Sequence, residues 1–285
     1  MSSSPVAVVT DSTAYLPPGV AERRGLHVVP LEVRYGDRTA RDGVDITPAE
    51  LVAALADRNL DVQTSRPAPA AFAALYEDIL RGGAEQIVSV HLSRELSGTW
   101  DAARLAAQET APDRIRVVDS RAVAMGLGFA VLTAADVTAG GGDGAAAEAA
   151  ATAVAARCRV LFGVQDLERL RRGGRIGAAS ALLGAAIAVK PLLHLSEGRI
   201  APLEKVRTTA RLTERLVALA VGAAAGPGAR LAVHHLGAPD RAEDIADRLR
   251  EQLPHAAEVQ VSEVGAVIGA HVGPGLVGVV VVPAG

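Results

Sequence analysis

The chain has 285 residues, of which 49% are apolar and 21% are charged, and its formal net charge at pH 7 is −3. This length and composition provide a sizeable core for one large or two medium domains. The near-neutral charge provides no extended basic field for phosphate backbones or anionic membrane surfaces, so nucleic-acid binding is not expected.

The remaining composition points to a cytoplasmic protein without stable membrane insertion. A single cysteine, Cys158, cannot form a disulfide within the chain, which fits a reducing compartment. The N-terminal residues lack the basic and apolar regions of a signal peptide, and the apolar run at 277–283 is too short to span a bilayer. Aromatic residues make up only 2% of the chain, so any pocket should have mainly aliphatic walls, which suit a flexible hydrocarbon.

In the first half of the chain, Val- and Ile-rich runs alternate with segments of helical period. This pattern predicts an α/β lobe with a largely parallel, Rossmann-like sheet. Thr47, Pro48 and Glu50 supply an N-cap, a first-turn proline and a capping-box glutamate for one helix. The predicted strands are 6–10, 26–33, 86–92 and 115–119, and the predicted helices are 49–55, 70–81, 98–108 and an Ala-rich helix that follows the Gly-rich turn at 139–144 and ends near 157.

The pattern of predicted elements changes after Cys158. We therefore place a lobe boundary there, with lobes at 1–158 and 159–285. The second lobe is predicted to be α/β with a mixed sheet that includes a hairpin turning at Glu197 and Gly198. Its predicted strands are 160–164, the hairpin across 192–203, 231–235, 258–264 and 276–282, and its predicted helices are 166–170, 209–221 and 241–253.

Several familiar binding and catalytic sites are excluded because their sequence motifs are absent. The sequence contains no Gly-x-x-x-x-Gly-Lys-Ser/Thr loop, no complete dinucleotide fingerprint, no Gly-x-Ser-x-Gly elbow and no His-Glu-x-x-His. His234 and His235 are adjacent on a predicted strand and would point to opposite faces, which argues against a shared metal ion. We therefore expect neither a nucleotide cofactor nor a metal.

Small hydroxyl residues gather at two predicted loop-to-helix junctions. Thr64 and Ser65 precede one predicted helix, whereas Ser93 and Ser97 follow a predicted strand. Ligands of α/β sheets usually bind at loops after the strands' carboxyl ends. A helix starting at Gly98 would direct backbone N–H groups and a positive dipole end at that crevice, which would suit a carboxylate. The alternative is that these hydroxyls are simply helix N-caps.

Two further positions are candidates for anion or partner binding. His271 lies in a run otherwise built of Gly, Ala, Val, Ile and Pro, whose glycines allow tight turns and close backbone approach, so that the ring could donate to an anion. A packed core histidine is the alternative. Arg207 follows Lys205 at the start of a predicted helix and offers a forked cation, with a solvated helix start as the alternative.

Taken in order, these segments resemble the motif set of the DegV family of bacterial fatty-acid-binding proteins. The resemblance covers about residues 5–283 and implies two α/β lobes with one long-chain fatty acid, such as palmitate or oleate, between or beneath them. The matching runs are Val9 to Thr13, Thr64 to Pro69, His91 to Ser93, Leu96 to Trp100, Val118 to Ser120, Leu167 to Ile176, Lys190 to Leu192, Lys205 to Arg207 and Gly269 to Gly275.

The resemblance also implies roles for individual residues. Thr64 and Ser97 hold the carboxylate by their hydroxyls, with Ser65, Ser93 and Gly98 as near neighbours. His271 lies near the carboxylate, and Arg207 lies on the surface shown to a partner. Arg66 stands where many relatives carry Gln, which leaves the hydroxyls intact but changes the local charge.

In family members that serve a fatty acid kinase, a separate ATP-binding subunit converts the bound acid to an acyl phosphate for phospholipid synthesis. The resemblance therefore implies a non-catalytic substrate carrier with no cofactor. A competing hypothesis is a hydrolase of acyl esters that uses Ser97 or Ser93 as nucleophile and His271 as base. No acidic residue that would orient His271 can be identified from the sequence.

Overall fold

The computed structural model describes residues 5–57, 60–165, 167–182 and 189–284. The chain folds into two compact units, each made of two stretches of sequence. Unit 1 comprises Met1–Glu32 and Ser65–Ala156, and unit 2 comprises Val33–Thr64 and Arg157–Gly285. The change of unit after Ala156 lies near the lobe boundary predicted at residue 158. Residues 33–64 also belong to unit 2, so one boundary along the chain does not separate the two units. The division into lobes at 158 stays a prediction.

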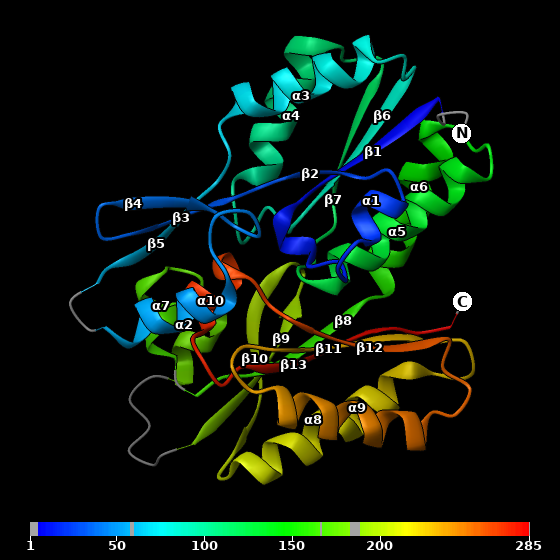
Figure 1. The fold of residues 1–285 in the computed structure, drawn as a ribbon. Coiled ribbons are helices and arrows are strands. Elements are labelled where there is room, and N and C mark those ends of the chain that lie inside the picture. The colour runs from blue at the N-terminus through cyan, green and yellow to red at the C-terminus, as the bar shows by residue number, and fades with distance from the viewer. Residues whose placement is uncertain (1–4, 58–59, 166, 183–188, 285) are drawn as a thin grey trace. The chain divides into compact units, whose positions relative to one another are not determined.

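Unit 1 is built on a parallel four-stranded sheet in the order β2-β1-β6-β7 (Figure 1). The parallel register places Val9 opposite both His27 and Ser89. The strands are β1 (Val6–Asp11), β2 (His27–Val29), β6 (Gln86–His91) and β7 (Ile115–Asp119), and the helices are η1 (Ser12–Ala14), α1 (Val20–Arg23), α3 (Pro69–Arg81), α4 (Thr99–Thr110), α5 (Met125–Ala139) and α6 (Gly144–Arg157). The sheet confirms the predicted parallel α/β architecture.

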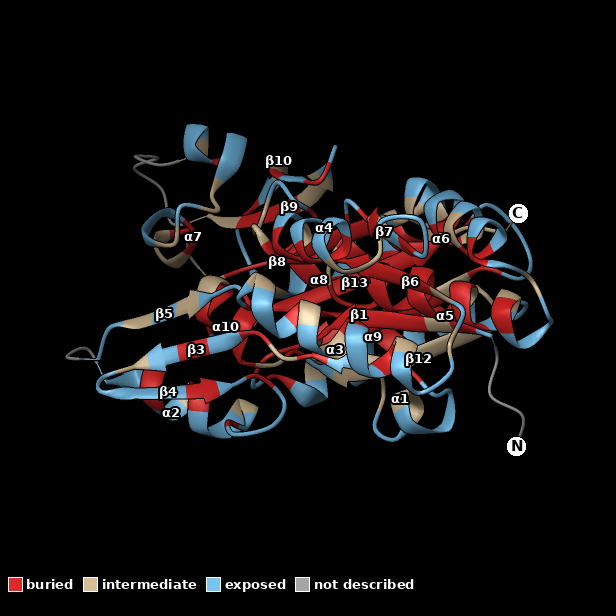
Figure 2. Ribbon diagram, turned by 90° about the horizontal axis from the view of Figure 1, so that it is seen from above, coloured by how far each residue is buried: buried red, intermediate tan, exposed pale blue. Residues whose placement is uncertain are grey.

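The central strands of unit 1 are buried on both faces. Burial runs along β1 and β6, whereas the outward sides of the helices are exposed (Figure 2). One face of the sheet packs against α3 and α4 through a cluster that includes Val9, Phe72, Tyr76, Ile87 and Ala103. Helices on both faces require strands that are apolar on both sides, which is why the strands read as continuous apolar runs.

Three features of the first 140 residues differ from the sequence prediction. The strand predicted at 26–33 is wrong, because Pro30 has no N–H to donate and separates β2 from β3 (Glu32–Tyr35). Strand β3 joins a second, three-stranded sheet in the order β4-β3-β5, with β4 at Arg38–Arg41 and β5 at Val62–Ser65. Helix α5 was not predicted, because it is apolar around most of its circumference and has no polar face to reveal a period.

Unit 2 contains a mixed six-stranded sheet in the order β10-β9-β8-β13-β11-β12, as predicted. Only β11 and β12 pair in parallel. Helices α8 and α9 pack on the sheet through an apolar cluster that includes Leu216, Leu231, Ile245 and Val279. The strands are β8 (Arg159–Gly163), β9 (Lys190–Ser196), β10 (Arg199–Val206), β11 (Arg230–His235), β12 (Glu258–Glu263) and β13 (Val277–Val282), and the helices are α2 (Pro48–Ala56), α7 (Glu168–Arg172), η2 (Gly177–Leu182), α8 (Thr209–Ala224), α9 (Pro239–Gln252) and α10 (Ala266–Val272).

Local sequence signals are confirmed where they are complete. The Thr47 hydroxyl accepts the Glu50 N–H at 3.2 Å, and the Glu50 carboxylate accepts the Thr47 N–H at 2.8 Å, so the capping box begins α2. The β9–β10 hairpin turns through Glu197 and Gly198, both with positive φ. Residue 166, where one helix was predicted to start, lies outside the described residues, and α7 begins at Glu168. No helix in the described part of the chain is both long and apolar enough to cross a bilayer.

Candidate functional site

Two of the predicted site residues, Thr64 and His271, meet in unit 2. Thr64 lies near the end of β5 and His271 lies on α10, 207 residues further along the chain. The Thr64 Oγ1 atom is 2.9 Å from the His271 Nε2 atom. The hydroxyl of Thr64 therefore has a titratable neighbour, and it does not cap a helix, since Thr64 belongs to a strand.

Helix α10 presents His271, and buried contacts hold this helix in place. The Ala266 N–H at its start donates to Asp42 Oδ1 at 2.6 Å. Gly269 packs against α2, where an added Cβ would lie 2.3 Å from Leu51 Cδ2. Gly173 lets the imidazole approach, because a Cβ there would lie 2.3 Å from His271 Nδ1. His271 itself lies in a short helix, and the tight turn expected of the flanking glycines follows that helix at Pro274 and Gly275, with positive φ at Gly273 and Gly275.

The protonation state of His271 decides what Thr64 can do. Burial, followed by the positive charge of Arg175, lowers the pKa of His271 to about 4, so the ring is neutral at pH 7 and carries one N–H. If that N–H is on Nε2, it donates to Thr64 Oγ1, and the Thr64 hydroxyl proton remains available for another acceptor. In this tautomer, the Thr64 hydroxyl keeps its capacity to donate a hydrogen bond.

In unit 1, the loop between β6 and α4 carries Ser93 and Ser97. Ser93 is buried, and its Oγ accepts the Glu95 N–H at 3.3 Å, which is a local turn contact. Ser97 is half-buried; its Oγ accepts the Thr99 N–H at 3.3 Å and lies 2.9 Å from Thr99 Oγ1. Neither serine is the N-cap of α4, which is Gly98, although Ser97 accepts the N–H of Thr99, the first residue of that helix. A Thr99 hydroxyl that donates to Ser97 leaves the Ser97 proton available for a ligand.

Ser65 and Gly98, which are predicted to lie near the carboxylate, each contact a charged side chain of unit 1. The Ser65 hydroxyl donates to Glu32 Oε2 at 3.2 Å. Arg66 lies over the start of α4, with Nη1 3.5 Å from the Gly98 carbonyl oxygen. A Cβ at position 98 would lie 2.2 Å from that Nη1 atom, so glycine allows the guanidinium to pack on the backbone. The positive charge of Arg66 therefore lies against the backbone of Gly98, the residue that follows Ser97.

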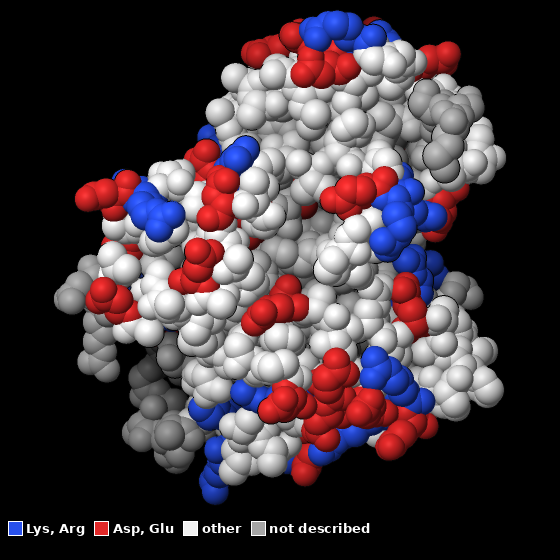
Figure 3. Space-filling view, in the orientation of Figure 1, with Lys and Arg blue, Asp and Glu red and all other residues white. Residues whose placement is uncertain are grey.

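Arg207 lines a basic hollow of about 520 Å³ in unit 2, between the end of β10 and the start of α8. Its other cationic lining residues are Lys205, Arg211 and Arg215. Arg215 forms an ion pair with Glu204, which offsets part of the charge. Elsewhere, Lys and Arg are interspersed with Asp and Glu over the face drawn in Figure 3, which fits the small net charge.

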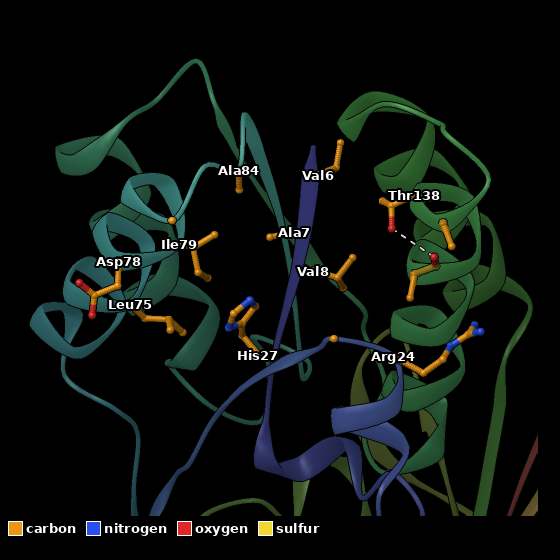
Figure 4. Close-up of a pocket in the computed structure, with 14 residues that line it drawn as sticks. Val6, Ala7, Val8, Arg24, His27, Leu75, Asp78, Ile79, Ala84 and Thr138 are labelled. Carbon is orange, nitrogen blue, oxygen red and sulfur yellow. Dashed lines mark hydrogen bonds between the residues drawn. The ribbon is translucent and has the colours of Figure 1, made fainter. Parts of the chain in front are cut away.

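A pocket of about 480 Å³ lies in unit 1 beside the first half of β1 (Figure 4). Leu75 and Ile79 of α3 line one side of it, and Val8 and Thr138 line the other. Its walls are mainly aliphatic, as predicted, whereas the hollow around Arg207 has mainly charged walls, so the prediction that any pocket would be aliphatic is wrong there. None of the residues predicted to hold the carboxylate belongs to this lining, so an aliphatic tunnel that leads to Thr64 and Ser97 stays a prediction.

Sequence reasoning missed a buried polar chain in unit 1. It joins Tyr76, Ser89, His91 and Asp11, all fully buried. The available signal was the alternation of Ser89 and His91 along one strand, which places both side chains on the same face.

The hydrolase alternative finds no support at His271. The Nε2 atom of His271 contacts Thr64, and among the described residues no carboxylate is hydrogen-bonded to this ring. Among the described residues, no group of three or more His, Cys, Asp and Glu side chains is arranged to hold a metal ion.

The sequence matches the DegV family, described as a family of uncharacterised proteins, over residues 5–284. The chain belongs to the DegV family. A DegV domain-containing protein of Streptomyces coelicolor is 55% identical to it over 276 residues, which cover 97% of this chain and 98% of the relative.

Solved DegV structures share the fold over nearly the whole length. A DegV family protein from Thermus thermophilus, described as binding fatty acid, superposes with a TM-score of 0.93 at 35% identity and covers 98% of this chain and 99% of its own. DegV from Bacillus subtilis, described as a fatty acid binding protein, has a TM-score of 0.89 at 33% identity and covers 99% of this chain and 100% of its own.

Proposed function

We propose that this DegV protein binds one long-chain fatty acid in the bacterial cytoplasm, with the carboxylate held by the hydroxyls of Thr64 and Ser97 and the tail in an aliphatic tunnel. The fatty acid binding described for the Thermus and Bacillus relatives supports the ligand class. The observation that carries the head-group assignment is the contact of 2.9 Å between Thr64 and the neutral His271.

The head-group chemistry follows from which atoms can donate. His271 can supply its proton to Thr64, and Thr99 can supply its proton to Ser97, so each candidate hydroxyl can donate its own proton outward. A carboxylate is an acceptor only and matches a site that presents donors. Arg66 adds a fixed positive charge near Ser97. In this proposal Ser65 and Ser93 have supporting roles, because their hydroxyls already have contacts with Glu32 and the Glu95 N–H.

The tail must supply most of the affinity. Burial of roughly a dozen methylenes at about 0.8 kcal/mol each stabilises the complex by about 10 kcal/mol before the cost of ordering the chain. A hydrogen bond to a charged group contributes only about 1.5–3 kcal/mol. The hydroxyls therefore set the register of the head group, and the choice between acids of different length lies with the tunnel.

A double-mutant cycle tests whether Thr64 and Ser97 hold the same carboxylate. Thr64→Ala and Ser97→Ala are each expected to weaken palmitate binding about 10-fold or more, as expected for loss of one charge-assisted hydrogen bond. The double variant should lose less than the sum, because the two residues share one ligand group. Calorimetry would measure the affinities, and native mass spectrometry would identify a co-purified acid.

Thr152→Ala is the matched control, since Thr152 is exposed on α6 and its hydroxyl donates to its own helix. Unchanged palmitate affinity in both single variants would remove Thr64 and Ser97 from the site. A wild-type chain that neither carries nor takes up a fatty acid would contradict the proposed ligand.

We also propose that the loaded protein presents the carboxylate to a separate ATP-dependent kinase subunit, which forms an acyl phosphate for phospholipid synthesis. The absence of a phosphate-binding loop from the sequence fits a carrier that leaves phosphoryl transfer to a partner. The basic hollow around Arg207 is the proposed docking surface, because exposed cations there would complement an acidic patch on the kinase.

Reversal of the charge at Arg207 tests this docking surface. Arg207→Glu is expected to lower kinase-dependent acyl phosphate formation at least 10-fold while palmitate affinity stays unchanged, since a like-charge contact across an interface is strongly unfavourable. Arg248→Glu, on the exposed side of α9, is the control of equal charge change. Equal phosphorylation of both variants would exclude the hollow as the docking surface.

A further inference from the structure

Four fully buried side chains in unit 1 form a continuous hydrogen-bonded chain, which we call the buried relay: Tyr76, Ser89, His91 and Asp11. The Tyr76 hydroxyl donates to Ser89 Oγ at 2.8 Å, Ser89 Oγ lies 2.7 Å from His91 Nε2, and His91 Nδ1 lies 3.0 Å from Asp11 Oδ2. The ring of Phe72 packs edge-on against the imidazole at a centroid distance of 5.1 Å.

The direction of every bond in the buried relay follows from Asp11. Its carboxylate is also contacted by the Thr13 N–H at 3.1 Å, the Thr13 hydroxyl at 2.5 Å and the Leu92 N–H at 3.0 Å. An acceptor surrounded by these donors is an anion, so His91 carries its proton on Nδ1. Nε2 is then an acceptor, Ser89 donates to it, and Tyr76 donates to Ser89.

Ser89, His91 and Asp11 are thus hydrogen-bonded in the same order as a catalytic Ser-His-Asp triad. Unlike the residues of such a triad, they are not accessible to a substrate. All three are fully buried, and the Ser89 oxygen already accepts the Tyr76 proton. None of them lines the pocket beside β1. The arrangement is suited to holding a structure in place.

The buried relay ends at the loop that carries Ser97. Asp11 Oδ2 accepts the Leu92 N–H, and Leu92 immediately precedes Ser93. The Ser93 N–H donates to Ala122 O at 2.9 Å, and the Ser93 carbonyl accepts the Ser97 N–H at 3.2 Å. The position of Ser97 therefore depends, through two residues, on where Asp11 holds the end of β6.

We propose that the buried relay is a positioning device for the Ser93–Gly98 loop, and that it enables the site to discriminate a carboxylate from an uncharged head group. Its four members are positioning residues, since they act through the loop. This inference rests on the proposed fatty acid function. It adds that head-group selectivity depends on the hydrogen bonds of the buried relay.

Removal of Ser89 tests the mechanism. In Ser89→Ala, the Asp11 carboxylate still holds the His91 proton on Nδ1, but the Nε2 atom loses its donor and Tyr76 loses its acceptor. The imidazole is then held from one side only, so we expect the ring to shift and the contact between Asp11 and the Leu92 N–H to loosen. We expect ¹⁵N NMR to show the Nδ1–H tautomer in the wild type and in Ser89→Ala, with faster hydrogen exchange at the Leu92 amide in the variant.

The functional readout is the ratio of affinities for palmitate and 1-hexadecanol, which share a tail and differ in head-group charge. Ser89→Ala should lower this ratio about 10-fold, the effect of misplacing one charge-assisted hydrogen bond. Tyr76→Phe removes only the outermost donor and should lower the ratio less, in the same direction. Ile87→Val, a fully buried position on the same strand, is the control for a general loss of stability.

The outcomes separate the two proposals. A wild-type ratio in Ser89→Ala together with an unchanged Leu92 amide would overturn the positioning role. An equal fall of the ratio in Ile87→Val would also overturn it, because any loss of core packing would then suffice. A wild-type chain that does not bind palmitate would contradict the proposed function alone, and hydrogen exchange at the Leu92 amide would still decide whether the buried relay holds the loop.

Discussion

Replacement of Asp11 with Ala is expected to lower the free energy of unfolding by about 3–5 kcal/mol, because several buried donors lose their acceptor and each unsatisfied group costs about 1–3 kcal/mol. The carboxylate is fully buried and joins the end of β1 to the end of β6 through His91 and Leu92. Its loss leaves the Thr13 and Leu92 N–H groups and the His91 ring without an acceptor in a site that excludes water. Urea unfolding followed by circular dichroism measures the change.

Two further variants make the Asp11 measurement specific. Asp11→Asn keeps the shape but directs an NH₂ group at surrounding donors, so it should also destabilise the fold. Asp113→Asn makes the same chemical change at an exposed position and should alter the free energy of unfolding by less than about 0.5 kcal/mol. A loss below about 1 kcal/mol in Asp11→Ala would mean that the donors find water or new partners.

Acidification from pH 6.5 to pH 4 is expected to cost the folded state about 3 kcal/mol through His234 alone. Burial lowers the pKa of this imidazole to about 4, from an ordinary value of 6.5. Between pH 6.5 and pH 4, His234 therefore binds a proton in the unfolded chain but not in the folded chain. The free energy of unfolding falls as the pH falls through this range. The decrease ends near pH 4, where the folded state also becomes protonated.

The contribution of His234 is isolated by comparison of variants at pH 7, 5.5 and 4. His234→Gln removes the titration, so its free energy of unfolding should fall about 3 kcal/mol less over this range than that of the wild type. His271 acts in the same direction, because burial also lowers its pKa to about 4, and the wild type should therefore lose stability more steeply than His234 alone predicts.

Much of the fold could be predicted from the sequence because its signals are local. A capping box needs only Thr47 and Glu50 three residues apart, and the β9–β10 hairpin needs only Glu197 and Gly198 between two apolar runs. The two sheets follow from the alternation of Val-rich runs with helical periods. These signals lie within about one turn or one strand, so they can be recognised without knowledge of the tertiary structure.

The prediction failed where the local signal was absent or pointed elsewhere. Helix α5 is buried on most sides and shows no amphipathic period. The run at 26–33 has the apolar character of one strand, yet Pro30 divides it between two sheets. Helix α10 is short and contains glycine, and its position is stabilised by Asp42, more than 200 residues earlier in the chain.

By itself, the sequence determined the α/β class, the family and the hydroxyl residues worth testing, since these depend on residue type, spacing and order. Only the tertiary structure decided which side chains meet: Thr64 with His271, and Asp11 with His91. The physical reason is that a hydrogen bond depends on the distance between two atoms in space. The spacing of residues along the chain does not show which distant residues the fold brings together. Burial, which sets the charge of His234 and His271, is likewise a property of the packed molecule.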